Sequence, residues 1–554
     1  MKINNMVLAR LSIITGLALT GCVTSSEVMV SQVNEPVAST ALQSRETAKL
    51  NAWFEDKFEQ ELMLSPNSLT TLGRSERQNE IDDYSDQAYD AKIALKKANL
   101  AELLSVFDYS KLSDDAKLSY DLWVYMNEKA FAAYEFRYNP YVFEQMNAVH
   151  SSFPKLLIAL HKVETGKHMQ QYLLRVSSTG RALDQLIDSS KKNAKKGVRP
   201  PYFAFEAVID ESTKIITGAP FSDGDDSAVW ADAKAKIAVL LEQNQISPSE
   251  ADQLTNNIEQ ALVNDFKPAY ERLIAWQEKD KVNATALAIG ASALPNGLAF
   301  YNERLANQTT TSLSADEIHN IGLAEVYRLR SEMEVVQAEF GFKGSLQDFF
   351  VFLRDNKDDR RLYYPNTDKG RQGYIDDATA AINKIKQVLP DYFGILPKAD
   401  MVVKRVEAFR EQDGAAQHYS SSTPDGSRPG IYYAHLSDMT AMPKRELEVI
   451  AYHEGLPGHH MQQAISLELT NVPTFRKQSY FNAYVEGWAL YSEWLAKEMP
   501  GTYQDPLSEF GRLDSEMWRA IRLVLDTGLH AKGWSEEKAI AYFKENSAIT
   551  GEQA

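Results

Sequence analysis

The feature that most constrains the fold of this chain is the recurrence of apolar residues every three or four positions. This is the spacing of an amphipathic helix, and it is clear in residues 172–186 and 227–245. Ser314 and Glu317 form a capping-box pattern immediately before another such run, and they mark a helix start there. Short turns containing Pro and Gly separate the periodic segments. The sequence therefore predicts a mostly α-helical protein.

Length and segment order suggest how these helices are grouped. A chain of 554 residues exceeds one ordinary core, yet it has no Gly/Ser-rich linker after residue 46 and no internal repeat. We expect one helical lobe at 46–280 and a second at 281–554, which form one unit around a deep cleft. Residues 401–406 and 431–435 are the best strand candidates, so at most a small β element is expected in the second lobe.

The N-terminus has the pattern of a secretory signal peptide. Lys2 and Arg10 give a positive start, and the apolar run 11–19 is shorter than the roughly 20 residues of a membrane span. The Leu-Thr-Gly-Cys sequence that ends at Cys22 resembles a bacterial lipobox, in which the cysteine receives a lipid and becomes the new N-terminus. We therefore expect residues 1–21 to be removed.

The residues after the cleavage point indicate where the protein is held. Cys22 is the single cysteine, so the chain forms no internal disulfide and no thiolate metal site. Val23 stands where an aspartate would indicate inner-membrane retention, which implies an outer-membrane anchor facing the periplasm. Residues 22–45 lack a periodic apolar face and suit a flexible tether, so the fold should begin near Glu46.

The charge balance limits the partners. A formal net charge of −17 repels nucleic acid and anionic lipid headgroups. We expect no nucleic-acid partner and membrane contact through the lipid anchor only, and the sequence predicts no particular protein partner.

The second lobe contains an unusual concentration of histidine. His453, His459 and His460 fall within eight residues, and Glu454 follows the first of them. A zinc hydrolase needs two neutral imidazoles, a further ligand, and a carboxylate beside the metal-bound water. The usual pattern is His-Glu-x-x-His on one helix. This cluster therefore predicts a zinc site with Glu454 as general base.

The spacing departs from the usual pattern. On a straight helix His453 and His460 would be about 10.5 Å apart along the axis, whereas ligands of one zinc ion lie ~3–4 Å apart. Pro457 interrupts the helix, and Gly455 and Gly458 permit unusual backbone angles. We therefore expect a bulge that returns a histidine to His453. His459 is favoured as the ligand, and His460 is the alternative.

A third ligand is expected from the helix that follows. Glu486 lies in a Val-Glu-Gly context, off the apolar stripe of the predicted helix around 482–493, and its distance in sequence suits a helix–loop–helix return to His459. Glu493 is the candidate partner for the second nitrogen of a metal-bound histidine.

Four blocks, in order, resemble a known family. Residues 425–430, 453–460, 484–488 and 526–534 are similar to the bacterial family known as domain of unknown function 885, along nearly the whole chain after the tether. That family resembles the gluzincin clan of zinc peptidases, whose helical members include thimet oligopeptidase and angiotensin-converting enzyme. The resemblance implies a mostly helical molecule with a deep channel that admits short peptides.

Other residues in these blocks have candidate roles beside simpler ones. His530 is the first choice for a donor to an oxyanion, with Tyr432 or Tyr433 second. Asp526, four residues before His530, is a supporting residue or alternative ligand. Arg428 could grip a substrate carboxylate in a bidentate fork. The simpler alternatives are a capped helix end for His530 and Asp526, core packing for the tyrosines, and loop bracing for Arg428.

The sequence thus favours zinc-dependent hydrolysis of short peptides in the bacterial envelope. It contains no Gly-x-Ser-x-Gly, and Cys22 is used for lipid, so serine or cysteine catalysis has little support. A non-catalytic binding lipoprotein on a peptidase-like fold is one alternative, and Glu454 argues against it because a structural metal site needs no base. A metal-dependent amidase or esterase would share the same chemistry.

Overall fold

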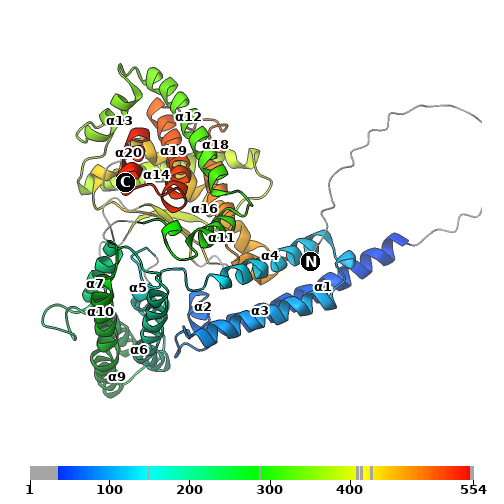
Figure 1. Ribbon diagram of the computed structural model, residues 1–554, viewed down its shortest axis with the longest axis vertical. Coiled ribbons are helices and arrows are strands. Elements are labelled where there is room, and N and C mark those ends of the chain that lie inside the picture. Colours follow the sequence, from blue (N-terminus) through cyan, green and yellow to red (C-terminus); the bar gives the residue numbers. More distant parts are fainter. Residues whose placement is uncertain are drawn as a thin grey trace, which may run out of the picture.

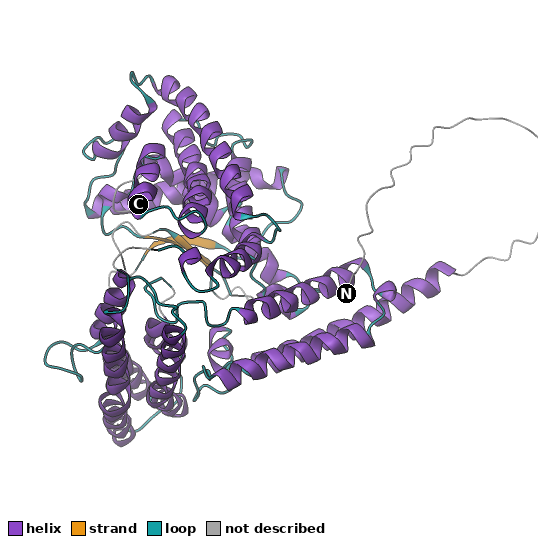
Figure 2. Ribbon diagram, in the orientation of Figure 1, coloured by secondary structure: helices purple, strands orange, loops and turns teal. Residues whose placement is uncertain are grey.

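A computed structural model describes most of the chain. The described residues are 35–146, 149–285, 289–406, 411, 416–423 and 428–548. Cys22 and the expected signal peptide lie outside them. Helices dominate and a single small sheet is present among these residues, which confirms the predicted mostly α-helical class (Figure 2).

The first group of helices forms an arm that extends away from the rest of the molecule (Figure 1). Its members are α1 (Glu35–Leu62), α2 (Pro66–Thr71), α3 (Asp86–Val106) and α4 (Asp114–Glu135). Helix α1 begins before Glu46, where we expected the fold to start, so part of the expected tether is helical. Leu50 and Phe54 are fully buried in the arm, and extending a helix from such packed turns costs little.

The second group is a bundle with its own core. Its helices are α5 (Val149–Lys155), α6 (Gly166–Lys195), α7 (Tyr202–Ile215), α8 (Ala228–Glu242), α9 (Pro248–Ala261) and α10 (Lys267–Lys281). The predicted helical segment 172–186 lies within α6, and most of 227–245 forms α8. Residues 46–280 therefore contain two packed groups, because the core of the bundle is separate from that of the arm.

The third group contains the remaining helices and the sheet. The helices are α11 (Gly297–Thr309), α12 (Ala315–Phe340), α13 (Leu346–Asp355), α14 (Asp368–Val388), α15 (Leu447–Ile450), α16 (His459–Glu468), α17 (Thr474–Gln478), α18 (Asn482–Ala496), α19 (Pro506–His530) and α20 (Glu536–Asn546). The predicted capping box is present at the start of α12, where Glu317 N–H donates to Ser314 Oγ at 3.3 Å and Ser314 N–H donates to Glu317 at 2.8 Å. Helices α12 and α19 pack along each other.

The sheet has three strands in the order β1-β3-β2. Strand β1 (Met401–Arg405) is parallel to β3 (Gly430–Ala434), and β2 (His418–Ser420) is antiparallel to β3. The two predicted strand segments correspond to β1 and β3. Strand β2 was not predicted, since three residues are too few to show an alternating pattern.

The arm and the third group meet at two places. Phe475 of α17 is part of the arm's hydrophobic core, and α11 contacts both α4 and α18. No described helix has the length and apolar character needed to cross a bilayer.

Candidate metal centre

The segment that carries the clustered histidines is broken by a tight turn. A π-helical turn, Ala451–Gly455, precedes the break, and α16 begins after it at His459. The N–H of Gly458 donates to the carbonyl oxygen of Tyr452 at 3.0 Å. A Cβ atom at Gly458 would lie 2.0 Å from the carbonyl oxygen of His453, so the close approach requires glycine. The predicted bulge is present, and it brings the rings of His453 and His459 to a centroid distance of 4.7 Å.

Helix α18 holds this turn in place. The indole N–H of Trp488 donates to the carbonyl oxygen of Pro457 at 2.9 Å, and the Ser492 hydroxyl donates to the same oxygen at 3.2 Å. Glu486 and Glu493 belong to the same helix. The anchor therefore also sets the position of both glutamates relative to the histidines.

Three of the predicted ligands lie together. His453 Nε2 is 3.7 Å from Glu486 Oε2, and His459 Nε2 is 3.8 Å from the same oxygen. The candidate ligand atoms of the three residues all lie within 4.8 Å of one another. Two ligands about 2.1 Å from one zinc ion are separated by ~3–4 Å, and two histidines with a glutamate form a known catalytic zinc set. The two histidine–glutamate distances lie in this range, and the three residues are of the types that bind zinc.

The electrostatics of the metal-free protein also favour a cation here. Burial lowers the pKa of His453, but its contacts with Glu486 and Glu493 outweigh burial and raise that pKa to about 9. The same contact with His453, together with the charge of His459, lowers the pKa of Glu486 to about 2. The two carboxylates therefore stabilise positive charge at this point.

Glu454 lies beside the cluster in the π-helical turn. It is buried, and burial, reinforced by the charge of Glu486, raises its pKa to about 7. The charges of His453, Arg519 and Glu493 also act on this carboxyl group, so it faces the same environment as the candidate ligands. A carboxyl group with a pKa near the working pH suits a general base.

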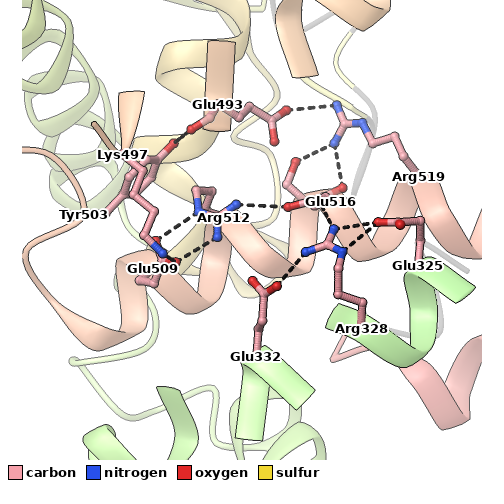
Figure 3. Close-up of polar contacts among 11 residues, drawn as sticks. Glu325, Arg328, Glu332, Glu493, Lys497, Tyr503, Glu509, Arg512, Glu516 and Arg519 are labelled. Carbon is pink, nitrogen blue, oxygen red and sulfur yellow. Dashed lines mark hydrogen bonds and ion pairs between the residues drawn. The ribbon is translucent and has the colours of Figure 1, made fainter. Parts of the chain in front are cut away.

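Glu493 and Arg519, which pair with each other in Figure 3, both contact His453. Glu493 Oε1 is 2.6 Å from His453 Nδ1, so the carboxylate accepts a hydrogen bond from that nitrogen. Arg519 Nη2 is 3.4 Å from the same oxygen and 3.2 Å from His453 Nδ1. Burial raises the pKa of Glu493, but the charges of Arg519 and His453 outweigh it and lower that pKa. Glu493 is thus an ionised partner that leaves Nε2 of His453 to face Glu486.

Arg519 has no feature in the sequence that sets it apart from its neighbours. It lies on α19 among other charged residues, where it looks like part of an ordinary solvent-facing surface. Figure 3 shows that this surface is a network: Arg512, with 2% of its side chain exposed, pairs with Glu509 at 2.8 Å and Glu516 at 3.0 Å, and Glu516 pairs with Arg328 of α12. Helical periodicity alone does not reveal such pairing.

His460 is placed away from the cluster. Its Nδ1 accepts a hydrogen bond from the Tyr419 hydroxyl at 2.9 Å, and its Nε2–H donates to the Ala399 carbonyl oxygen at 3.0 Å. Both ring nitrogens are used in these contacts, and the ring is buried. The geometry therefore favours His459 over His460 as the second candidate ligand.

The two tyrosines of β3 have different surroundings. Tyr432 is fully buried, and its hydroxyl is hydrogen-bonded to that of Tyr374 at 2.7 Å. This placement favours the core-packing alternative for Tyr432. Tyr433 is half-buried, and its ring stacks on His418 with the centroids 5.3 Å apart.

Arg428 lies just before β3 on an exposed segment, next to residues 424–427, which are outside the described chain. Its backbone N–H donates to Thr423 Oγ1 at 2.9 Å. Burial raises the pKa of Tyr419 to about 12, and the Arg428 charge opposes this rise, so the guanidinium is within electrostatic reach of Tyr419.

His530 and Asp526 belong to a separate contact group at the end of α19. Ala291 N–H donates to His530 Nδ1 at 3.1 Å, and the Tyr301 hydroxyl donates to Asp526 Oδ1 at 2.5 Å. Residues 519 and 530 are separated by about 16 Å of helix axis. Among the described residues, no contact joins His530 or Asp526 to the cluster. Their i, i+4 spacing was visible in the sequence, but their distance from the histidines was not.

Fold and site together define a mostly helical protein in which two buried histidines and an exposed glutamate meet beside a three-stranded sheet. The chain belongs to the family described as "Bacterial protein of unknown function (DUF885)", whose model matches residues 66–554. A search of curated proteins finds no match.

Two solved structures are similar to this one. One is described as "the putative lipoprotein from Colwellia psychrerythraea", with a TM-score of 0.81 and 25% sequence identity over 92% of this chain and 87% of that chain. The other is "a putative lipoprotein of unknown function from Shewanella oneidensis", with a TM-score of 0.64 and 17% identity over 90% of this chain and 86% of that chain. The second likeness concerns the fold alone.

Proposed function

We propose that this protein is a zinc-dependent peptidase that cleaves short peptides in the bacterial envelope. The observation that carries the proposal is the convergence of His453 Nε2 and His459 Nε2 on Glu486 Oε2, at 3.7 and 3.8 Å. Buried Glu454 stands directly beside this set. A purely structural metal site needs the ligands but has no use for a buried base, so the combination favours hydrolysis.

The ligands proposed to hold the ion are His453, His459 and Glu486. Bound zinc lowers the pKa of a coordinated water toward ~7 and polarises a carbonyl oxygen. The Glu454 carboxylate takes a proton from the attacking water and later delivers it to the leaving amine. Such proton transfer is typically worth about 10²–10⁴ in rate. Glu493 accepts the Nδ1 proton of His453 in a hydrogen bond and so fixes the tautomer of the ring.

Negative charge that develops on the substrate needs a donor. Arg519 Nη2 is 3.5 Å from His453 Nε2, so this guanidinium is placed to stabilise such charge at the cluster. His530 lies farther along α19, and a direct role for it remains a prediction from the sequence.

We also propose that the mature protein is tethered by lipid on Cys22, with the outer membrane as its location. The Leu-Thr-Gly-Cys sequence supports lipidation, and Val23 supports the outer membrane. The description of the Colwellia psychrerythraea structure as a putative lipoprotein adds support for the anchor.

The test of the peptidase is hydrolysis of a random peptide library by Glu454→Gln, followed by mass spectrometry, with zinc measured in parallel. We expect the wild type to bind about one zinc per chain, as predicted from one cluster. Glu454→Gln should keep that zinc and lose about 10²–10⁴ in rate. Glu498→Gln, which alters an exposed residue near the end of α18, is the matched control and should behave as wild type.

Three outcomes would change the assignment. Undiminished hydrolysis by Glu454→Gln would exclude this base. A zinc-loaded wild type that cleaves no peptide would favour the binding-protein alternative. Cleavage of envelope amides or esters, but of no peptide, would assign the same centre to an amidase or esterase.

A further inference from the structure

A pocket lies at the interface between the arm and the third group. This open pocket of about 390 Å³ is lined by residues of α4, α11 and the segment that leads into α18. Tyr125 and Lys129 of α4 face Asn307 of α11, with Tyr480 and Phe481 completing the wall. Pockets for small ligands typically measure roughly 300–1,000 Å³, so this one can take a short peptide segment.

Tyr480 connects the wall of the pocket to the candidate metal centre. The Tyr480 hydroxyl donates to Glu486 Oε1 at 3.2 Å, and Glu486 is a candidate ligand. On the other side, the rings of Tyr125 and Phe481 are in contact, with their centroids 6.0 Å apart. A peptide whose end is held in the pocket would therefore lie close to Glu486 and the candidate metal centre.

The residues that line the pocket carry a positive charge, whereas the chain as a whole has a net negative charge. Lys129 carries the single charge among the described lining residues. Its Nζ is 3.4 Å from the Ala306 carbonyl oxygen and 5.3 Å from the centre of the Tyr125 ring. No carboxylate of the described residues pairs with it, although the chain has a net charge of −17. A half-buried cation without a counter-ion is suited to an anionic ligand.

The Tyr125 hydroxyl is an independent indication of a ligand. Its oxygen is buried and has no hydrogen-bond partner among the described residues. Buried polar groups are normally hydrogen-bonded, and leaving one unsatisfied costs about 1–3 kcal/mol. Tyr125 and Lys129 both line the pocket, so a ligand oxygen that reaches this hydroxyl would supply its missing partner.

We infer that this pocket binds the C-terminal carboxylate of a short peptide. Lys129 forms the ion pair, the Tyr125 hydroxyl donates a hydrogen bond to the same carboxylate, and Met126 and Phe481 contact the terminal side chain. This inference rests on the proposed function, since it names the end of the substrate that is held near the centre. It also differs from the sequence-based expectation, which gave the carboxylate to Arg428.

The experiment measures binding without turnover. A random tripeptide library, prepared as free acids and as C-terminal amides, is incubated with Glu454→Gln protein, and retained peptides are identified by mass spectrometry. We expect free acids to be retained over amides. Adding Lys129→Gln should weaken free-acid binding by about 10- to 100-fold and leave amide binding unchanged.

Two further variants separate charge from folding. Lys129→Arg keeps the cation and should keep the preference for free acids. Lys97→Gln removes an exposed lysine of α3 that similarly lies over an aromatic ring, 5.7 Å from the centre of Phe131, and should have no effect.

The outcomes separate this pocket from the peptidase proposal. Equal retention of acids and amides, or an unchanged preference in Lys129→Gln, would overturn the pocket while wild-type hydrolysis still supports the peptidase. A preference that is lost in Arg428→Gln but kept in Lys129→Gln would move the carboxylate to Arg428 and overturn it as well. A Lys129-dependent preference in a protein that cleaves no peptide would support the pocket and reject the peptidase.

Discussion

Two buried glutamates near His453 have pKa values that are shifted in opposite directions. Burial raises the pKa of Glu454 to about 7. Glu493 is also buried, but the charges of Arg519 and His453 outweigh burial and lower its pKa. Environments that separate the pKa values of neighbouring carboxyl groups commonly assign them different roles. Under the proposed function, Glu454 is therefore suited to accept a proton and Glu493 to orient the ring of His453 as a carboxylate.

This distinction predicts that Glu493→Gln weakens zinc binding, whereas Glu454→Gln does not. The Glu493 carboxylate lies 2.6 Å from His453 Nδ1, and replacement of such outer partners typically costs about 10- to 100-fold in metal affinity or activity. Competition with a chelator of known affinity measures the zinc dissociation constant of each variant. Equal zinc affinity in Glu493→Gln and wild type would contradict an orienting role for this carboxylate.

The central residues of the site could be chosen from the sequence because each belongs to a chemically unusual local pattern. A helix-breaking Gly-Leu-Pro-Gly segment lies between the pair His453 and Glu454 and the following His459. Glu486 and Glu493 are about two helical turns apart. Zinc chemistry then limits which of them can act together.

Residues that reach the site only through the packing of distant helices could not be predicted from the sequence. Arg519 reaches His453 from α19, and its own segment shows only ordinary helical charge spacing. Lys129 and Tyr125 come from the arm, far from the histidines in sequence. His530 was chosen for its motif, yet its described contacts are with Ala291 and Tyr301. A single sequence does not specify which helix surfaces face each other.

Among the elements, short α17 connects the arm to the third group. Its Phe475 is 3% exposed and lies 4.8 Å from Phe54 of α1 and 4.9 Å from Trp123 of α4, measured between ring centroids. Arg476 of the same helix pairs with Asp115 at 2.9 Å. Because α17 precedes α18 directly, this contact links the arm that carries Lys129 to the helix that carries Glu486.

We therefore predict that Phe475→Ala loosens the arm. Truncation of a buried Phe typically costs about 3–5 kcal/mol. Thermal unfolding should occur at lower temperature, and limited proteolysis should cut within α1 to α4 before the rest of the chain. Gln478→Ala, at an exposed position of the same helix, is the control and should change stability by less than about 0.5 kcal/mol. An arm that resists protease equally in Phe475→Ala and wild type would contradict this account.

Across the whole molecule, helix content was easier to predict than helix grouping. The three- and four-residue spacing correctly indicated α6 and α8, and the capping box correctly placed the start of α12. The expected lobe at 46–280 contains an arm and a bundle with separate cores. Local periodicity shows which face of a helix is buried, but it does not show which other helix covers that face.

The net charge and the N-terminus bear on where this molecule resides. A chain with a charge of −17 has no electrostatic attraction to an anionic bilayer. We propose that lipid attached at Cys22 holds the mature protein at the membrane. A single acyl chain binds reversibly, whereas the several chains expected at a lipobox cysteine give a stable anchor.

We accordingly predict that the full-length chain incorporates labelled palmitate in a bacterial host and that Cys22→Ser does not. Since Cys22 is the single cysteine, the label has no other thiol to report on. The variant should move from the membrane fraction to the soluble fraction, while zinc content and peptide hydrolysis stay unchanged because the candidate ligands lie between residues 453 and 486. Separation of inner and outer membranes on a density gradient tests the role assigned to Val23. Wild-type protein recovered soluble and unlabelled would contradict the anchor, whereas labelled protein in the inner membrane would contradict only the proposed outer-membrane location.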